Sequence, residues 1–165
     1  MKKGLLLDRD GILIKERGEY NYLHEHFIPL KENIPFLKEM QQQGYLLMVV
    51  TNQGGIAKGL YTHEDLHFFH QMMINFFHKQ GIEFSKIYYC PHHPDISACL
   101  CRKPGHLLIQ KAISEFNLSP QESIMIGDKP TDIIAAENAG VKGLLVEPNQ
   151  KLDIQILNQI IKTGN

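Results

Sequence analysis

The sequence predicts an α/β fold in which a parallel β-sheet is flanked by helices. Short apolar runs alternate along the chain with segments of helical periodicity, and several of those segments end at a glycine. Strands that alternate with helices are joined by crossover connections, which make them parallel and cover both faces of the sheet. The 165 residues, 43% hydrophobic and 21% charged, fit a single domain over 1–165 with its own core.

Five apolar runs have the length of buried strands. They consist mainly of Leu, Val, Ile and Met, as expected of parallel strands that are covered on both faces. The predicted strands are residues 4–7, 45–50, 86–90, 123–127 and 143–146.

Four longer segments are predicted to be helices from their 3.6-residue periodicity and their end signals. Thr62 begins a capping box with Asp65 in the place of the usual Glu or Gln, and the helix that follows ends at Gly81. Its apolar face carries Leu66, Phe69, Met73, Phe76 and Phe77, whereas its histidines 63, 67, 70 and 78 fall largely on the polar side. The other predicted helices are residues 34–43, 106–116 and 130–139.

Two shorter signals complete the predicted elements. Ser119 and Glu122 fit a capping box with Pro120 at the first helical position, which predicts one helical turn before the fourth strand. Apolar residues at helical spacing near the C-terminus predict a helix over about 151–162 that docks on the sheet.

Charge and composition exclude several classes of partner. The net charge of −1 provides no basic surface for nucleic acid or an anionic membrane. The apolar run after Lys3 is too short for a signal peptide, and no run is long enough to span a bilayer. An odd number of cysteines, three, cannot pair completely within the chain. We therefore expect a cytoplasmic, reduced protein without a nucleic-acid or membrane partner.

Carboxylates follow two of the predicted strands. Asp8 and Asp10 come directly after the first strand, and their repulsion falls when Mg²⁺ lies between them. The alternative is a solvated turn, in which Asp and Gly are common. Asp128 follows the fourth strand and is well placed as a further ligand. Asp132, four residues later, is better explained as a residue that stabilises a helix N-terminus.

The second strand ends in a segment suited to an anion. Thr51, Asn52, Gln53 and Gly54 offer a hydroxyl, two amides and backbone N–H groups at a strand end. A flexible loop remains the alternative interpretation.

The three cysteines lie within twelve residues, together with two histidines. Cys90, His92, Cys99 and Cys101 supply three thiolates and one imidazole, the set that a closed tetrahedral zinc site requires. His93 could replace His92, but His92 has the same spacing from Cys90 as Cys99 has from Cys101. The alternative is three unrelated thiols.

Two cations follow the last of these cysteines. A zinc ion at Cys101 would fix the positions of Arg102 and Lys103, which suit a phosphate clamp and a point charge for a phosphoryl group. The alternative is two solvated cations.

The motifs together resemble those of the haloacid dehalogenase (HAD) superfamily. Asp-x-Asp-Gly at 8–11, Thr51, Lys103 and Gly-Asp-x-x-x-Asp at 127–132 occur in the superfamily's order. The cysteine motif followed by Arg-Lys-Pro is similar to the small branch that contains heptose bisphosphate phosphatases and histidinol-phosphate phosphatase domains. The likeness, over about 4–148, implies a Rossmann-like HAD core, a zinc-binding loop at 90–101 and no large cap domain.

The resemblance also implies a role for each matching residue. Asp8 would be the nucleophile and Asp10 the general acid and base, with Thr51 and Lys103 on the phosphoryl oxygens. Mg²⁺ would be held by Asp8, the backbone carbonyl of Asp10, and Asp128. The expected substrate contacts are Asn52, Gln53, Gly54, Arg102, Lys129 and, by a looser match, Glu16, Arg17, Gly18 and Glu19.

The expected function is therefore that of a Mg²⁺-dependent phosphatase with a structural zinc ion. The best match is removal of the 7-phosphate of D-glycero-D-manno-heptose 1,7-bisphosphate, in the supply of lipopolysaccharide core precursor. The short segment between His92 and Cys99 is closer to the histidinol-phosphate branch, which is the alternative. Further alternatives are a polynucleotide 3′-phosphatase, which the charge disfavours, and a zinc-stabilised binding protein without activity. We expect a monomer that binds a small phosphorylated sugar.

Overall fold

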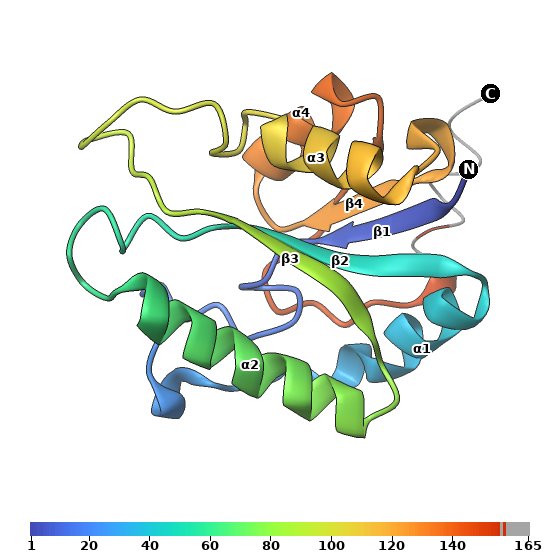
Figure 1. The fold of residues 1–165 in the computed structure, drawn as a ribbon. Coiled ribbons are helices and arrows are strands. Elements are labelled where there is room, and N and C mark those ends of the chain that lie inside the picture. The colour runs from blue at the N-terminus through green and yellow to red at the C-terminus, as the bar shows by residue number, and fades with distance from the viewer. Residues whose placement is uncertain (156, 158–165) are drawn as a thin grey trace.

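The structure is a computed structural model, and it describes residues 1–155 and residue 157 (Figure 1). In this part of the chain, five strands form one parallel sheet in the order β3-β2-β1-β4-β5. They are β1 (Lys3–Leu7), β2 (Tyr45–Asn52), β3 (Phe84–Cys90), β4 (Ile124–Gly127) and β5 (Lys142–Leu145). The predicted fold class is confirmed, and each predicted strand overlaps an observed one.

Helices cover both faces of the sheet. The four α-helices of the described residues are α1 (Ile34–Gln42), α2 (His63–Lys79), α3 (Leu107–Phe116) and α4 (Pro130–Asn138). Figure 1 shows α1 and α2 on one face and α3 and α4 on the other. Side chains alternate along a strand, so Leu5 and Leu7 pack toward α1 and α2, and Leu6 packs toward α3 and α4. Over residues 1–155 and 157, no helix combines the length and apolar content that a membrane crossing requires.

Of the two capping boxes predicted from the sequence, one is confirmed and the other is wrong. The box at the start of α2 is confirmed: the backbone N–H of Asp65 donates to Thr62 Oγ1 over 3.1 Å, and that of Thr62 donates to Asp65 Oδ2 over 2.8 Å. The box predicted at Ser119 is wrong, because Pro120–Glu122 forms a single 3₁₀ turn in which the Ser119 side chain makes no cap bond. The predicted C-terminal helix lies largely outside the described residues.

The strand order determines where a ligand can bind. From β1 the chain proceeds to β2 and β3 on one side, and then returns to β4 and β5 on the other. The carboxyl ends of β1 and β4 therefore flank a crevice at the point where the strand order reverses. Between β1 and α1 only two short 3₁₀ turns occur, His24–His26 and Lys31–Asn33, so no large cap domain lies over this crevice.

One buried amide connects segments that are distant in the sequence. Asn33 Nδ2 donates to the carbonyl oxygen of Ile12 over 2.8 Å, and Asn33 Oδ1 accepts from the backbone N–H of Leu152 over 2.8 Å. The Asn33 side chain thus joins the loop after β1 to the C-terminal segment.

We expect Asn33→Ala to lower the free energy of unfolding by about 2 kcal/mol, because it leaves a buried carbonyl and a buried N–H without a partner. Urea denaturation measures the change. Asn75→Ala, an exposed site on α2, is the matched control and should change stability by less than about 0.5 kcal/mol. Equal effects of the two substitutions would contradict the role given to Asn33.

Candidate active site

A polar cleft lies at the carboxyl edge of the sheet, at the predicted crevice. Its volume is about 490 Å³. It is lined from β1, β2, the loop before α3 and the start of α4, which the parallel sheet brings to one edge. Its lining residues are Asp8, Asp10, Tyr20, Thr51, Asn52, Gly54, Pro94, Arg102, Lys103, Pro104, Lys129, Thr131 and Asp132.

A buried ammonium group lies at the base of the cleft. Lys103 Nζ contacts Asp8 Oδ1 at 2.9 Å, Asp132 Oδ1 at 2.6 Å and the carbonyl oxygen of Val50 at 2.6 Å. Burial by itself would lower the pKa of Lys103, but the carboxylates of Asp8 and Asp132 outweigh it and raise the pKa. The ammonium therefore stays charged beside Asp8.

Asn52 positions the backbone of this lysine. Its Nδ2 donates to the carbonyl oxygen of Lys103 over 3.1 Å, and its Oδ1 accepts from the backbone N–H of Lys103 over 3.0 Å. The end of β2 thus carries part of the cleft wall and also fixes the segment after the cysteine loop.

Gln53 orients the hydroxyl group of Thr51 through a hydrogen bond. Tyr61 donates its phenol hydrogen to Gln53 Oε1 over 2.6 Å, which turns Gln53 Nε2 toward Thr51 Oγ1 at 2.9 Å. Because Thr51 Oγ1 accepts this bond, its own hydrogen is free to point into the cleft. Burial raises the pKa of Tyr61, so the phenol remains protonated and keeps this orientation.

Asp128 carries the clearest sign of a cation site. Its Oδ1 is buried and makes no hydrogen bond within the described part of the chain. Burial, followed by the negative charge of Asp8, raises the pKa of Asp128 to about 6. The Asp8 and Asp128 side chains can offer oxygens to one ion, which fits the hard ligands that Mg²⁺ prefers.

A glycine lets the loop after β1 lie close to Asp128. Gly11 has φ of +85°, and a Cβ there would lie 2.5 Å from Asp128 Oδ2. The glycine that follows Asp10 therefore lets the β1 and β4 loops meet.

Asp132 faces Lys103 and caps α4. Its Oδ2 accepts from the backbone N–H of Lys129 over 3.0 Å, which supports the interpretation as a helix-start residue. The ion pair with Lys103 was not predicted. Asp132 could reach the same ion as Asp8 and Asp128, but its Oδ1 is already engaged by the ammonium.

Lys129 and the segment after β1 border the cleft on the other side. Lys129 Nζ lies 3.4 Å from Glu16 Oε2. A neighbouring hollow is lined by Glu16, Gly18, Glu19, Tyr20, Asp128, Lys129 and Pro148. These contacts place most of the predicted substrate segment beside the candidate cation site.

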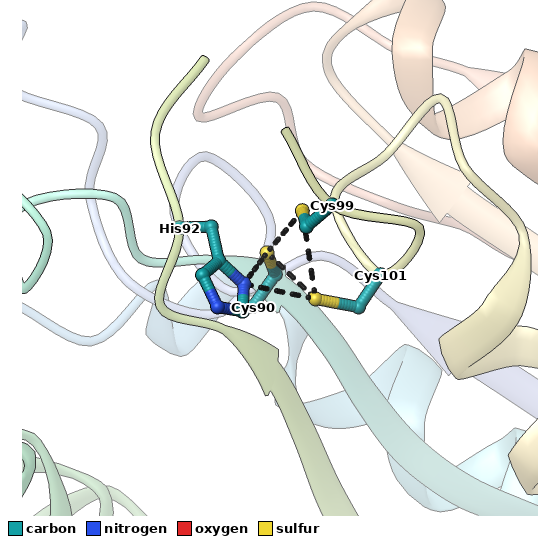
Figure 2. A group of neighbouring side chains, drawn as sticks. All are labelled: Cys90, His92, Cys99 and Cys101. Carbon is teal, nitrogen blue, oxygen red and sulfur yellow. Dashed lines mark hydrogen bonds between the residues drawn. The ribbon is translucent and has the colours of Figure 1, made fainter. Parts of the chain in front are cut away.

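The four predicted zinc ligands converge on one point (Figure 2). The sulfur atoms of Cys90, Cys99 and Cys101 are 3.0 to 3.7 Å apart, and His92 Nδ1 lies 3.3 Å from the sulfur of Cys101. Zinc at about 2.3 Å from each thiolate requires sulfur atoms roughly 3.8 Å apart, so most of these distances suit the ion. Burial raises the pKa of the Cys90 thiol, and a metal ion would offset that cost of ionisation.

His93, next to His92 in the sequence, contacts an aspartate outside the cysteine cluster. His93 Nδ1 lies 3.4 Å from Asp95 Oδ2 and outside the cysteine cluster, which agrees with the choice of His92. Arg102 Nη1 donates to the carbonyl oxygen of His92 over 3.1 Å. The arginine that lines the cleft is thereby tied to the candidate zinc loop.

Two of the predicted substrate contacts lie elsewhere. The side chain of Gln53 is buried beneath the cleft, where its polar atoms bond to Asp10, Thr51 and Tyr61. Arg17 is absent from the lining of the cleft and of the neighbouring hollow, and its Nη1 donates to Asn21 Oδ1 over 3.1 Å. Gln53 therefore positions other side chains and does not contact a ligand from its place in the structure.

Three further buried residues were missed. Arg9 and Asn21 contact Asp10, and His70 contacts Arg9. The placement of His70 on the polar side of its helix was wrong. A signal for His70 was present, because it lies four residues after Leu66 and three before Met73 on the apolar face. Arg9 has no such signal apart from its place between two carboxylates.

The chain is similar to proteins named as phosphatases along nearly all of its length. A family model described as HAD-hydrolase-like matches residues 100–154. The D-glycero-beta-D-manno-heptose-1,7-bisphosphate 7-phosphatase of Haemophilus ducreyi is 36% identical in an alignment that covers 97% of this chain and 95% of that protein. The histidine biosynthesis bifunctional protein HisB of Legionella pneumophila is 37% identical and is matched over 87% of this chain and 41% of that protein.

A solved structure has a similar fold. It is the D,D-heptose 1,7-bisphosphate phosphatase from B. bronchiseptica, in complex with magnesium and phosphate. The TM-score is 0.83 and the identity 25%, with 99% of this chain and 87% of the other covered.

Asp128→Asn should stabilise the protein in the absence of added Mg²⁺. The pKa of this carboxyl lies above its unfolded value of 3.8, so ionisation reduces stability increasingly between about pH 4 and 6 and fully above that range. We expect a gain of about 1 kcal/mol at pH 7.5, after discounting for solvent screening, and none near pH 4. Thermal melts at the two pH values measure it, with exposed Glu64→Gln as the control. A loss of stability at both pH values would contradict the cation-site assignment.

Cys99→Ser should remove bound zinc and lower the free energy of unfolding by several kcal/mol, because metal binding is coupled to the order of the loop. Elemental analysis and denaturant titration measure the two effects. Ser97→Ala, in the same loop, should retain stoichiometric zinc and the stability of the wild type. A wild-type protein without zinc would show that the cluster has another role.

Proposed function

This chain belongs to the family of HAD-type phosphatases that includes the heptose bisphosphate phosphatases, and on that premise we propose a Mg²⁺-dependent reaction through an aspartyl-phosphate. The enzyme is a phosphoric monoester hydrolase. The observation that carries the proposal is the position of Asp8 at the end of β1, bound to the buried ammonium of Lys103 and close to the unpartnered oxygen of Asp128.

The first step is phosphoryl transfer to Asp8. A carboxylate oxygen of Asp8 attacks phosphorus, the new O–P bond forms, and the bond from phosphorus to the leaving oxygen breaks. Asp10 gives its proton to that oxygen, so the product leaves as an alcohol. The Lys103 ammonium and the Thr51 hydroxyl bind the equatorial oxygens, where preorganised donors stabilise the transition state.

The second step hydrolyses the intermediate. Asp10, now a carboxylate, takes a proton from a water molecule, whose oxygen attacks phosphorus. The bond between Asp8 and phosphorus breaks, phosphate is released, and the proton on Asp10 restores the starting state. One residue thus acts as an acid and then as a base, which requires a fixed position beside the reacting atoms.

The metals have separate proposed roles. Asp8 and Asp128 would hold Mg²⁺ through side-chain oxygens, together with the backbone carbonyl of Asp10. When bound, Mg²⁺ reduces the repulsion between the anionic nucleophile and the anionic substrate. The zinc ion is structural in this proposal, and it fixes the loop that leads into Arg102 and Lys103.

The proposed substrate is a sugar phosphate, most specifically the 7-phosphate of D-glycero-D-manno-heptose 1,7-bisphosphate. The relative from Haemophilus ducreyi, which covers nearly the whole chain, supports this choice. The cleft offers polar groups to such a substrate at Asn52, Arg102 and Lys129. Histidinol phosphate is the second candidate, because HisB of Legionella pneumophila is similar to 87% of this chain.

The proposal also includes a cellular compartment and an oligomeric state. The thiols of Cys90, Cys99 and Cys101 are free of disulfides, which supports a reducing, cytoplasmic compartment. The proposed enzyme is a monomer, since one chain is sufficient to line the cleft. Its product would enter the supply of lipopolysaccharide core precursor.

The test is phosphate release from heptose 1,7-bisphosphate, other sugar bisphosphates and histidinol phosphate, with and without Mg²⁺. We expect Mg²⁺-dependent turnover, with the highest kcat/KM on the heptose bisphosphate. Asp8→Asn should lower kcat at least about 10⁴-fold because the nucleophile is lost. Asp95→Asn, outside the cleft, is the control and should retain activity.

Two results would overturn parts of this proposal. A higher kcat/KM on histidinol phosphate would replace the substrate, and the chemistry would stand. Absence of Mg²⁺-dependent turnover of every ester in the panel would refute the phosphatase itself.

A further inference from the structure

Arg9 holds the carboxylate of Asp10 from below the cleft. Its side chain has no exposed surface, and Nε lies 3.1 Å from Asp10 Oδ2, while Nη2 lies 3.2 Å from Oδ1. Such a two-pronged contact fixes the plane of a carboxylate as well as its distance. Asn21 and Gln53 add amide donors to the two oxygens at 2.7 and 3.2 Å.

Arg9 is itself held at points that do not involve Asp10. Nη2 donates to the carbonyl oxygen of Asn21 over 2.8 Å, and the guanidinium carbon lies 4.8 Å from the centre of the Phe69 ring. Nη1 lies 3.2 Å from Nε2 of His70. His70 comes from α2, and neither His70 nor Arg9 lines the cleft.

The contact between Arg9 and His70 defines the state of the imidazole. A guanidinium group can donate hydrogen bonds but cannot accept them, so Nε2 of His70 must be the acceptor. His70 is then neutral and carries its hydrogen on Nδ1. Burial, then the positive charge of Arg9 and that of His67, lowers the pKa of His70 to about 2, which agrees with this tautomer.

We propose that His70 is a positioning residue which acts through Arg9 to hold Asp10 in place for proton transfer to the leaving group. The inference rests on the proposed function, because it assigns the acid and base role to Asp10. His70 contacts neither the cleft nor the candidate metal ligands, and no motif of the resemblance includes it.

The catalytic cycle explains why Arg9 needs a second, neutral anchor. Asp10 alternates between a carboxylate and a carboxylic acid, so the attraction between Asp10 and Arg9 weakens whenever Asp10 carries the proton. The lone pair of His70 does not change during this cycle. With the Asn21 carbonyl and the Phe69 ring, it keeps the guanidinium in position until the Asp10 carboxylate forms again.

The leaving group of the substrate provides the test. A sugar alkoxide must be protonated as it departs, whereas 2,4-dinitrophenolate leaves without a proton. The parameter kcat/KM reports only the steps up to phosphoryl transfer, so hydrolysis of the intermediate does not obscure the comparison. We expect His70→Leu to lower kcat/KM about tenfold or more for the sugar phosphate and less than about threefold for 2,4-dinitrophenyl phosphate.

Two further variants separate positioning from general damage. His70→Gln retains an acceptor for Arg9 and should restore most of the loss on the sugar phosphate. His67→Leu, an exposed site one turn earlier on α2, should leave both substrates unaffected. An equal loss on both substrates in His70→Leu, or no loss on either, would overturn the inference.

An NMR measurement tests the geometry without any variant. Two-bond ¹H–¹⁵N correlations should show His70 Nε2 without a proton from pH 5 to 9, and a protonated Nε2 would contradict the contact. The proposed function has a separate point of failure. Wild-type protein that hydrolyses neither ester with Mg²⁺ would refute both claims, whereas active wild-type protein with normal His70→Leu activity refutes this inference alone.

Discussion

The Lys103 ammonium is the group on which the rest of the site depends. It is buried, so its charge is stable only because Asp8, Asp132 and the Val50 carbonyl surround it. Those partners come from the ends of β1 and β2 and from α4. A single buried cation therefore holds Asp8, the middle of the sheet and the α4 N-terminus in one arrangement.

Both the cysteine loop and the sheet constrain the position of Lys103. Asn52 at the end of β2 binds the backbone of Lys103 through the nitrogen and the oxygen of its side-chain amide. Cys101, two residues earlier, belongs to the cluster of three cysteines and His92 that could hold a metal ion. The loop that carries Lys103 has no regular secondary structure, and a metal ion at the cluster would add to the constraint from Asn52. The proposed reaction needs such a constraint, since a catalytic charge displaced by about 1 Å loses much of its effect.

Sequence reasoning identified the parts of the site that follow strand ends. Asp8, Thr51 and Asp128 could be predicted because polar residues after buried strands gather at one edge of a parallel sheet. The residues that orient these groups could not be predicted, because Arg9 looks like a turn residue and Gln53 looks like part of an anion-binding loop. Both are buried by contacts to Asn21, Tyr61 and His70, which are distant in the sequence. Local pattern therefore located the candidate reacting groups, and only the tertiary structure revealed the contacts that orient them.

The central claim is that Asp8 is the nucleophile, with Mg²⁺ and Lys103 on either side of the transferred group. A crystal structure with Mg²⁺ and beryllium fluoride, which mimics a phosphoryl group, tests this most directly. The account predicts beryllium bonded to a carboxylate oxygen of Asp8, Mg²⁺ bound by Asp8 and Asp128, and a fluoride ligand hydrogen-bonded to Lys103. Beryllium fluoride on Asp10 or outside the cleft, or Mg²⁺ bound away from Asp128, would contradict it.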